Sequence, residues 1–160
     1  MGNLFGEVCE NGHILNYGAT SSGMQYCYRC PPHTKVLTRC PNCGDPIRVG
    51  ETTGEEVCAL ETPDFYPPRS CPYCGEEFIW YRRYLANVKA AIHDTPNLSA
   101  KDIQTLDALI NKMSDGTPCT PREKERFQKI LGKAGEPTKE LVYSLIRIFF
   151  TELVNKFLGL

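Results

Sequence analysis

The sequence predicts an α+β protein, in which a small β region rich in cysteine is followed by an all-α bundle of about four helices. Eight of the nine cysteines fall within residues 9–75, among frequent Gly, Pro and Asp residues that are typical of turns. From residue 76 onward, apolar residues recur three and four positions apart, as they do in amphipathic helices. Formal charge changes in the same region, from −5 over residues 1–80 to +4 over the remainder. We therefore expect two domains, residues 1–75 and residues 76–160.

The β region is predicted to consist of short hairpins. Candidate strands at residues 35–39 and 47–49 lie between turn residues. Residues 50–70 form a long excursion that ends in a Pro-rich stretch, and its X-Pro steps disfavour helix. We expect this excursion to be a further hairpin.

Four helices are predicted from apolar periodicity and capping signals, with short connections between them. The first covers residues 76–92. The second, over residues 98–113, has a capping-box pair at Ser99 and Asp102, and Gly116 is placed to close it. The third has Thr120 as N-cap, Pro121 at its first position and Glu123 three residues after the cap, and ends at Gly132 or Gly135. The fourth opens at Thr138 and runs almost to residue 160.

The cysteines are strongly paired in sequence, in the motifs CYRC, CPNCG and CPYCG, and CENGH adds a cysteine with a nearby histidine. Zinc takes four tetrahedral ligands from Cys and His, which two such short-spaced pairs supply. Glycine after the second cysteine of CPNCG and CPYCG permits the positive φ that a tight turn around a metal needs. We therefore predict tandem zinc ribbons holding two structural zinc ions. The eight predicted ligands, taken in chain order, are Cys9, His13, Cys27 and Cys30 for the first ion, and Cys40, Cys43, Cys71 and Cys74 for the second.

Several alternatives to this assignment remain open. A cross-brace would combine the first pair with the third and the second with the fourth, although nine residues between Cys30 and Cys40 favour tandem sites. His33 could replace His13, and iron could replace zinc in the all-cysteine site. Redox chemistry by the paired thiols is disfavoured because no βαβ pattern accompanies them.

No enzymatic activity is predicted. Four protein ligands at each site leave no position for a metal-bound water nucleophile. Cys58 is interpreted as a small buried side chain. Cys119 in TPCTP, with His93 far away in sequence, is interpreted as an inert residue near a helix start.

Taken in order, CENGH, CYRC, CPNCG, CPYCGEEFIW and TPCTPREKERFQKILGKAGEPT resemble a family of small bacterial proteins known only as a domain of unknown function with a double zinc ribbon. The resemblance covers nearly the whole chain, and its more specific parts are the C-x-NGH opening and residues 120–135. Pro31 follows Cys30 where the family's knuckle has glycine. The resemblance implies a zinc-binding first half and a helical second half, and it implies no activity.

Charge distinguishes the binding functions that remain. Seven thiolates and two zinc ions would take residues 1–80 from −5 to about −8, whereas a phosphate-binding surface needs Lys and Arg. The sequence therefore favours a non-enzymatic adaptor whose acidic zinc-bearing head recognises protein. The alternative is a nucleic-acid-binding zinc-ribbon protein, with Tyr26, Tyr28 and Tyr73 available to stack on bases, although packing against the metal core is the expected role of these rings.

The last helix supplies the second clue to function. Residues 141–158 are mostly Leu, Val, Ile and Phe, with a narrow polar line at Ser144, Arg147, Thr151 and Asn155. This helix could lie at the centre of the bundle, bind a protein partner or a second copy of the chain, or attach to a membrane surface. No apolar run is long enough to span a bilayer and no signal peptide is evident, so we expect a cytoplasmic protein.

Overall fold

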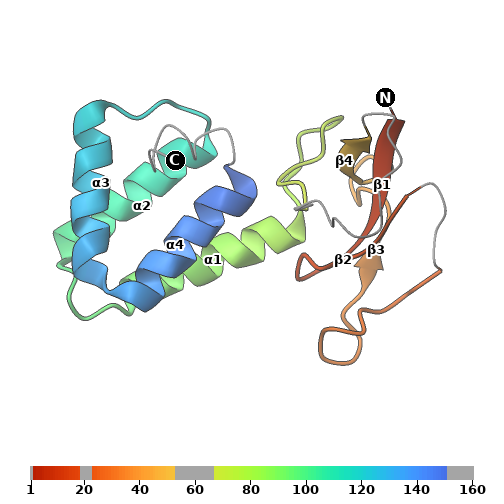
Figure 1. The fold of residues 1–160 in the computed structure, drawn as a ribbon, viewed down its shortest axis with the longest axis horizontal. Helices are drawn as coiled ribbons and strands as arrows, with labels where there is room; N and C mark the ends of the chain where they lie inside the picture. Colours follow the sequence, from red (N-terminus) through yellow and green to blue (C-terminus); the bar gives the residue numbers. More distant parts are fainter. Residues whose placement is uncertain (1, 19–22, 53–66, 151–160) are drawn as a thin grey trace. The chain divides into compact units, whose positions relative to one another are not determined.

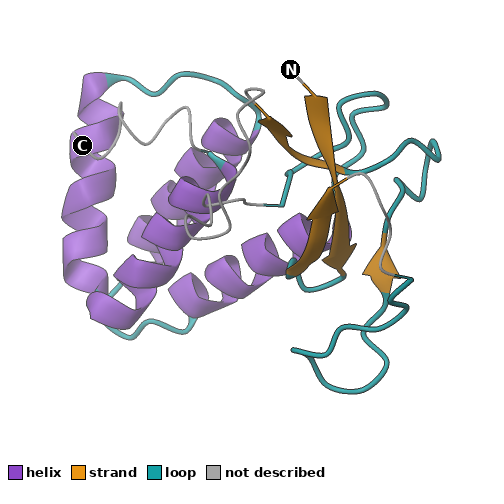
Figure 2. Cartoon of the chain, turned by 45° about the vertical axis from the view of Figure 1, so that its right-hand side comes forward, coloured by secondary structure: helices purple, strands orange, loops and turns teal. Residues whose placement is uncertain are grey.

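The computed structural model describes residues 2–18, 23–52 and 67–150, and the chain divides into two compact units, Met1–Arg83 and Tyr84–Leu160. Strands, cysteine-rich loops and the first turn of one helix make up the first unit, and helices make up the second (Figures 1 and 2). The predicted α+β class, antiparallel strands with cysteine clusters followed by four helices, is therefore confirmed. The division between residues 75 and 76 stays a prediction.

The first unit is built on a small antiparallel sheet in which β1 (Gly2–Cys9) is central. One edge of β1 pairs with β2 (Ile14–Gly18), and the other pairs with β3 (Val36–Leu37) and with β4 (Arg48–Thr52). Val8, Ile47 and Val49 are buried. The register of β1 shifts between Glu7 and Val8 opposite β2, and between Leu4 and Phe5 opposite β4. Such irregularities bend a strand locally, and β1 pairs with three different strands along its length.

The strand predictions are right in position and incomplete in number. Strand β3 lies inside the predicted residues 35–39, and β4 begins within the predicted residues 47–49 and continues to Thr52. Strands β1 and β2 have no counterpart among the sequence predictions. Residues 53–66 of the predicted hairpin, including Cys58, lie outside the described residues.

Helix α1 (Ile79–His93) begins three residues later than predicted. Glu76, Glu77 and Phe78 are extended instead, because they return along residues 69–71. Cys71 N–H donates to the Glu76 carbonyl (2.9 Å) and Phe78 N–H donates to the Arg69 carbonyl (3.0 Å). Residues 76–78 therefore belong to the hairpin that carries Cys71 and Cys74, although their apolar spacing alone predicted helix.

Helices α2 (Ala100–Ser114) and α3 (Pro121–Ala134) confirm the predicted capping. Each has a complete capping box, in which the hydroxyl of Ser99 or Thr120 accepts from the third backbone N–H of the helix while that residue's carboxylate accepts in return. After α2, Gly116 adopts a positive φ of 75° and closes the helix. Gly135, with φ of 89°, ends α3, whereas Gly132 lies within it.

Helix α4 (Glu136–Phe149) corrects the predicted last helix at both ends. It begins two residues before Thr138, because Gly135 serves as its N-cap and Pro137 fits its first turn. Phe150 has φ of −123° and ψ of 42° and leaves the helix after Ile148 and Phe149, side chains with low helix propensity. The predicted helix over residues 141–158 therefore stops at Phe149, and residues 151–160 lie outside the described part.

Helix α4 buries one face within the second unit. Val142, Leu145 and Ile146 are fully buried, whereas Leu141 is 38% exposed. Thr138 is buried as well, and its hydroxyl lies 2.8 Å from that of Thr95. Thr95 donates its one hydroxyl hydrogen to the Ala91 carbonyl (2.7 Å), so Thr138 donates to Thr95. Among the described helices, none combines the length and apolar character required to cross a bilayer.

Candidate metal centres

The first cluster joins the β1–β2 turn to the CYRC loop. Its four ligand atoms, from Cys9, His13, Cys27 and Cys30, all lie within 4.8 Å of one another. His13 presents Nδ1, which lies 3.5 Å from Cys9 Sγ, 3.1 Å from Cys30 Sγ and 3.7 Å from Cys27 Sγ. Cys9 and Cys27 are buried, and the other two are partly buried.

The second cluster contains only cysteine. Cys40, Cys43, Cys71 and Cys74 also place their sulfurs within 4.8 Å of one another. Sγ–Sγ distances are 3.7 Å between Cys40 and Cys74 and 3.6 Å between Cys43 and Cys71. Cys40 and Cys71 are buried, whereas Cys43 and Cys74 are exposed. Each cluster combines neighbouring pairs in chain order, which is the tandem arrangement and differs from a cross-brace.

These distances fit the edges of a tetrahedron around zinc. With Zn–S bonds of about 2.3 Å, tetrahedral geometry separates two sulfurs by about 3.8 Å. The Sγ–Sγ distances of 3.9 Å between Cys9 and Cys30, and of 3.7 and 3.6 Å in the second cluster, are close to this value. A disulfide would need about 2.0 Å. Both clusters therefore fit a four-coordinate metal ion, and three thiolates with one imidazole, or four thiolates, are donor sets that suit zinc.

All four ligand pairs lie at the tips of short hairpins whose turns differ in length but close in the same way. In each hairpin, the backbone N–H of the first cysteine donates to the carbonyl of a residue four to seven positions later. The residue before that acceptor has a positive φ. Gly12, Gly44 and Gly75 take this position in three hairpins, with φ of 87°, 79° and 75°. Glycine adopts this conformation without a Cβ penalty, which explains why it stands there.

The CYRC hairpin closes with the same kind of hydrogen bond but has no glycine at the residue with positive φ. Cys27 N–H donates to the carbonyl of Thr34 (2.9 Å), two residues farther along than in CPNCG and CPYCG. His33 precedes Thr34 and has φ of 78°, in the region that side chains other than glycine rarely adopt. The missing glycine after Cys30 is thus replaced by a longer turn that places the positive φ on His33. The exposed His33 is outside the cluster and contacts Tyr26 edge-on, with ring centroids 5.7 Å apart.

Replacing His33 with glycine is expected to raise the free energy of unfolding of the metal-loaded protein by about 1 kcal/mol, because it removes the left-handed strain. Chemical denaturation at a fixed free zinc concentration would measure the change. Gly44→Ala is the matched control at the equivalent turn position and should lower stability by a similar amount. A destabilised His33→Gly variant would contradict the assigned turn.

In each cluster, hydrogen bonds to one sulfur lower the pKa of that thiol. In the first, the Asn11 side chain donates to Cys30 Sγ (3.4 Å) and lowers the pKa of Cys30, whereas burial raises the pKa of Cys9 to about 11. In the second, a hydrogen bond from the Asn42 side chain and then one from the Glu76 backbone lower the pKa of Cys74 to about 7. Metal binding requires thiolates, so these two sulfurs are the ones best prepared to capture an incoming ion.

Asn11 contacts a predicted metal ligand, although the sequence analysis did not single it out. Its amide nitrogen contacts Cys30, and its carbonyl oxygen accepts a hydrogen bond from Arg83 (3.0 Å), which also pairs with Glu10 (3.6 Å). The Asn-Gly signal in CENGH identifies the turn, but nothing in the sequence indicates that Asn11 reaches a ligand of the other hairpin.

Exposure predicts the order in which the ligands react. When the metal-loaded protein is treated with limiting iodoacetamide, Cys43 and Cys74 should be alkylated before Cys9 and Cys27, because only exposed thiolates are accessible. Peptide mass spectrometry of the seven ligand cysteines would give the order. Loss of one metal ion should accompany the first phase, and earliest modification at Cys27 would contradict this prediction.

Residues weighed as alternatives lie elsewhere. His93 pairs with Asp107, with Nε2 2.8 Å from Oδ2. The pKa of Cys119 is raised by burial and by Glu123, the opposite of what activates a thiol. Contrary to the packing role expected for them, Tyr26, Tyr28 and Tyr73 are 48%, 74% and 51% exposed.

Two Cys/His clusters of four ligands on hairpin tips, followed by four helices, fit a double zinc ribbon joined to a helical segment. A family model described as "Uncharacterized protein conserved in bacteria (DUF2321)" matches residues 3–158. The chain belongs to this uncharacterised bacterial family, as its sequence motifs suggested. Comparisons with curated proteins and with solved structures found no significant match.

Proposed function

We propose that this protein is a non-enzymatic zinc-binding adaptor, in which two structural zinc ions hold an acidic head that recognises protein and the helical half mediates docking or self-association. The observation that carries the proposal is that each cluster supplies four protein ligands, so a bound zinc ion has no position left for a reacting water. The cytoplasm is the compartment we propose, because ligand thiols must stay reduced.

The charge of the head supports protein recognition. One zinc ion with three thiolates and a neutral imidazole leaves −1, and one with four thiolates leaves −2. These charges add to the formal −5 of residues 1–80. A negative net charge of this size attracts basic partners and repels phosphate.

Native mass spectrometry of the untagged full-length chain, beside its denatured mass, tests the zinc assignment. We expect two zinc ions per chain and no loss of mass from disulfides, and elemental analysis of the same sample distinguishes zinc from iron. Cys119→Ser is the matched control and should retain two ions. A metal-free chain with disulfide-linked masses would overturn the proposal in favour of redox chemistry.

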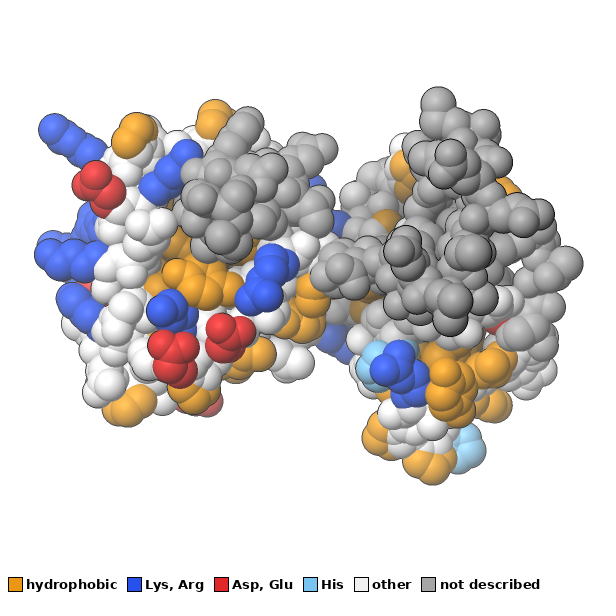
Figure 3. Space-filling view, viewed as in Figure 1, with side chains coloured by type: hydrophobic (Ala, Val, Ile, Leu, Met, Phe, Trp, Pro, Cys, Tyr) orange, Lys and Arg blue, Asp and Glu red, His pale blue; other side chains and the backbone are white. Residues whose placement is uncertain are grey.

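Nucleic-acid binding is the second candidate, and one observation favours it. Helix α3 exposes Arg122, Arg126, Lys129 and Lys133 at spacings of four, three and four residues, which puts four cations along one helix face. Figure 3 shows blue Lys and Arg side chains along α3. Affinity for duplex DNA that falls steeply between 50 and 200 mM salt would support this candidate over the adaptor.

A further inference from the structure

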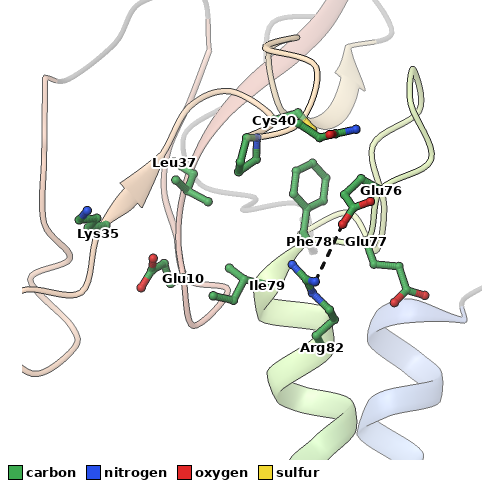
Figure 4. Close-up of a pocket in the computed structure, with 11 residues that line it drawn as sticks. Glu10, Lys35, Leu37, Cys40, Glu76, Glu77, Phe78, Ile79 and Arg82 are labelled. Atoms are coloured by element: carbon green, nitrogen blue, oxygen red, sulfur yellow. Dashed lines mark ion pairs between the residues drawn. The ribbon is translucent and has the colours of Figure 1, made fainter.

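The first unit contains a pocket of about 530 Å³ beside the second cluster. Its lining comes from four parts of the unit: the β1–β2 turn, the residues around β3, the CPNCG hairpin, and the segment from the last hairpin into the first turn of α1. In Figure 4, Glu10, Lys35 and Leu37 lie on one side and Glu76 and Arg82 on the other, with Ile79 and Phe78 between them. A pocket of this size accommodates a few side chains of a peptide.

The middle of the pocket is apolar. Leu37 and Ile79 are partly buried and Phe78 is 3% exposed, and Pro41 adds a further apolar surface. Phe78 stacks on Trp80 with ring centroids 4.5 Å apart, so the apolar wall is fixed from behind. An aliphatic side chain that enters the pocket would leave water and contact Leu37, Ile79 and Phe78, which is favourable because apolar surface is buried.

Carboxylates flank this apolar centre. Glu10, which also pairs with Arg83 (3.6 Å), and Glu76 lie on opposite sides, and Glu77 also contributes to the lining. Lys35 and Arg82 reduce the formal lining charge to −1. Arg82 pairs with Glu76 only weakly, at 3.9 Å with both side chains more than half exposed. Cys40 belongs to the lining as well, so a zinc ion bound by four thiolates would add −2 at the wall.

From this arrangement we propose that the pocket binds a short segment of a partner protein, in which one aliphatic side chain stands between two Lys or Arg residues. The proposal rests on the adaptor function and names the chemistry of its partner. The aliphatic side chain contacts Leu37, Ile79 and Phe78, while its basic neighbours reach Glu10 and Glu76. Nucleic acid does not fit, because its phosphates would meet the same carboxylates and the anionic metal centre.

The acetylated and amidated peptide Gly-Lys-Leu-Arg-Gly is the probe for this proposal, titrated into full-length zinc-loaded protein. Fluorescence of Trp80, the chain's single tryptophan, reports occupancy through its stacking on Phe78. We expect saturable binding that weakens with salt. Replacing leucine by glycine in the peptide should weaken binding about tenfold, the scale of one buried aliphatic side chain. The charge-reversed peptide Gly-Glu-Leu-Glu-Gly should not bind.

Two protein variants give opposite predicted changes. Glu76→Gln removes a carboxylate from the pocket and should weaken binding about threefold, whereas Arg82→Gln removes a competing cation and should tighten it about threefold. Glu125→Gln, on the exposed face of α3, changes net charge as Glu76→Gln does and should leave affinity unchanged. Equal effects of the Glu76 and Glu125 substitutions would overturn the proposal.

The zinc content of each sample, measured by native mass spectrometry, separates this proposal from the function on which it rests. Two zinc ions without binding of the basic peptide would overturn the pocket assignment and leave the zinc assignment intact. Fewer than two zinc ions would overturn the adaptor function and the pocket assignment with it. Equal affinity for the acidic peptide, or for single-stranded oligothymidine, would also overturn the proposed partner chemistry.

Discussion

Replacing Cys71 with serine is expected to reduce the zinc content from two ions per chain to one and to destabilise the first unit by more than about 5 kcal/mol. Cys71 is 2% exposed, and its sulfur lies 3.6 Å from that of Cys43. Serine does not supply a thiolate, so the second ion loses one of its four bonds. Structural zinc contributes about 10–16 kcal/mol to the folding of zinc-finger peptides, which is why the loss should be large.

The loss of stability in Cys71→Ser should be confined to the hairpins that carry the second cluster. Hairpins around residues 39–46 and 70–77 each hold one isolated β-bridge, Arg39 with Pro46 and Ser70 with Glu77, and a few turn hydrogen bonds, so we expect the metal to supply much of their stability. Hydrogen exchange of the variant should show lost amide protection in these hairpins and retained protection in α2 and α3. Cys119→Ser, outside both clusters, is the control and should change neither zinc content nor protection. Retention of two zinc ions by Cys71→Ser would contradict the assignment of the second site.

The sequence predicts those parts of the structure that local chemistry determines. A two-residue gap between cysteines and a following glycine determine a turn within about five residues, so the hairpin tips follow from CPNCG and CPYCG. The capping boxes at Ser99 and Thr120 are local in the same way, since both partners lie within four residues.

Features that depend on distant partners do not follow from the sequence. Strand β1 is stabilised by pairing with β4, more than forty residues away, and Gly6 in β1 is required because a Cβ there would lie 2.1 Å from Val49 Cγ1. The start of α1 was misplaced for the same reason: residues 76–78 have helical periodicity but pair with residues 69–71. The pocket was not predicted because Glu10, Cys40 and Ile79 come together only after the hairpins fold.

Trp80→Ala is expected to cost the first unit about 3–5 kcal/mol, the range measured when large buried aromatic residues are truncated. Trp80 is 2% exposed, although it lies only one residue after the start of α1. Its indole Nε1–H donates to the carbonyl of Pro68 (2.7 Å), and its ring stacks on Phe78. A Cβ at Gly12 would lie 3.3 Å from the Trp80 Cβ, so the first ligand turn packs directly against this side chain.

Trp80 contacts the Gly12 turn of the first cluster and also Phe78, which follows the hairpin of Cys71 and Cys74 in the second cluster. Its loss should therefore weaken zinc binding without removing a ligand. Competition with a chelator should show a lower zinc affinity for Trp80→Ala while two ions still bind at excess zinc, since folding and metal binding are linked. Trp80→Phe keeps one aromatic ring and loses the hydrogen bond to Pro68 and part of the buried ring surface, so a cost of about 1–2 kcal/mol is expected.

Leu106→Ala provides the matched control for this variant. Leu106 is fully buried like Trp80 but belongs to α2 in the second unit, so its truncation should cost about 2–5 kcal/mol. Zinc affinity should not change, because Leu106 belongs to the second unit and all eight predicted ligands belong to the first. If Trp80→Ala and Leu106→Ala changed zinc affinity equally, Trp80 would have no special role in supporting the two metal sites. An effect of the Trp80 substitution alone would show that the sites depend on this one side chain for their support as well as on their eight ligands.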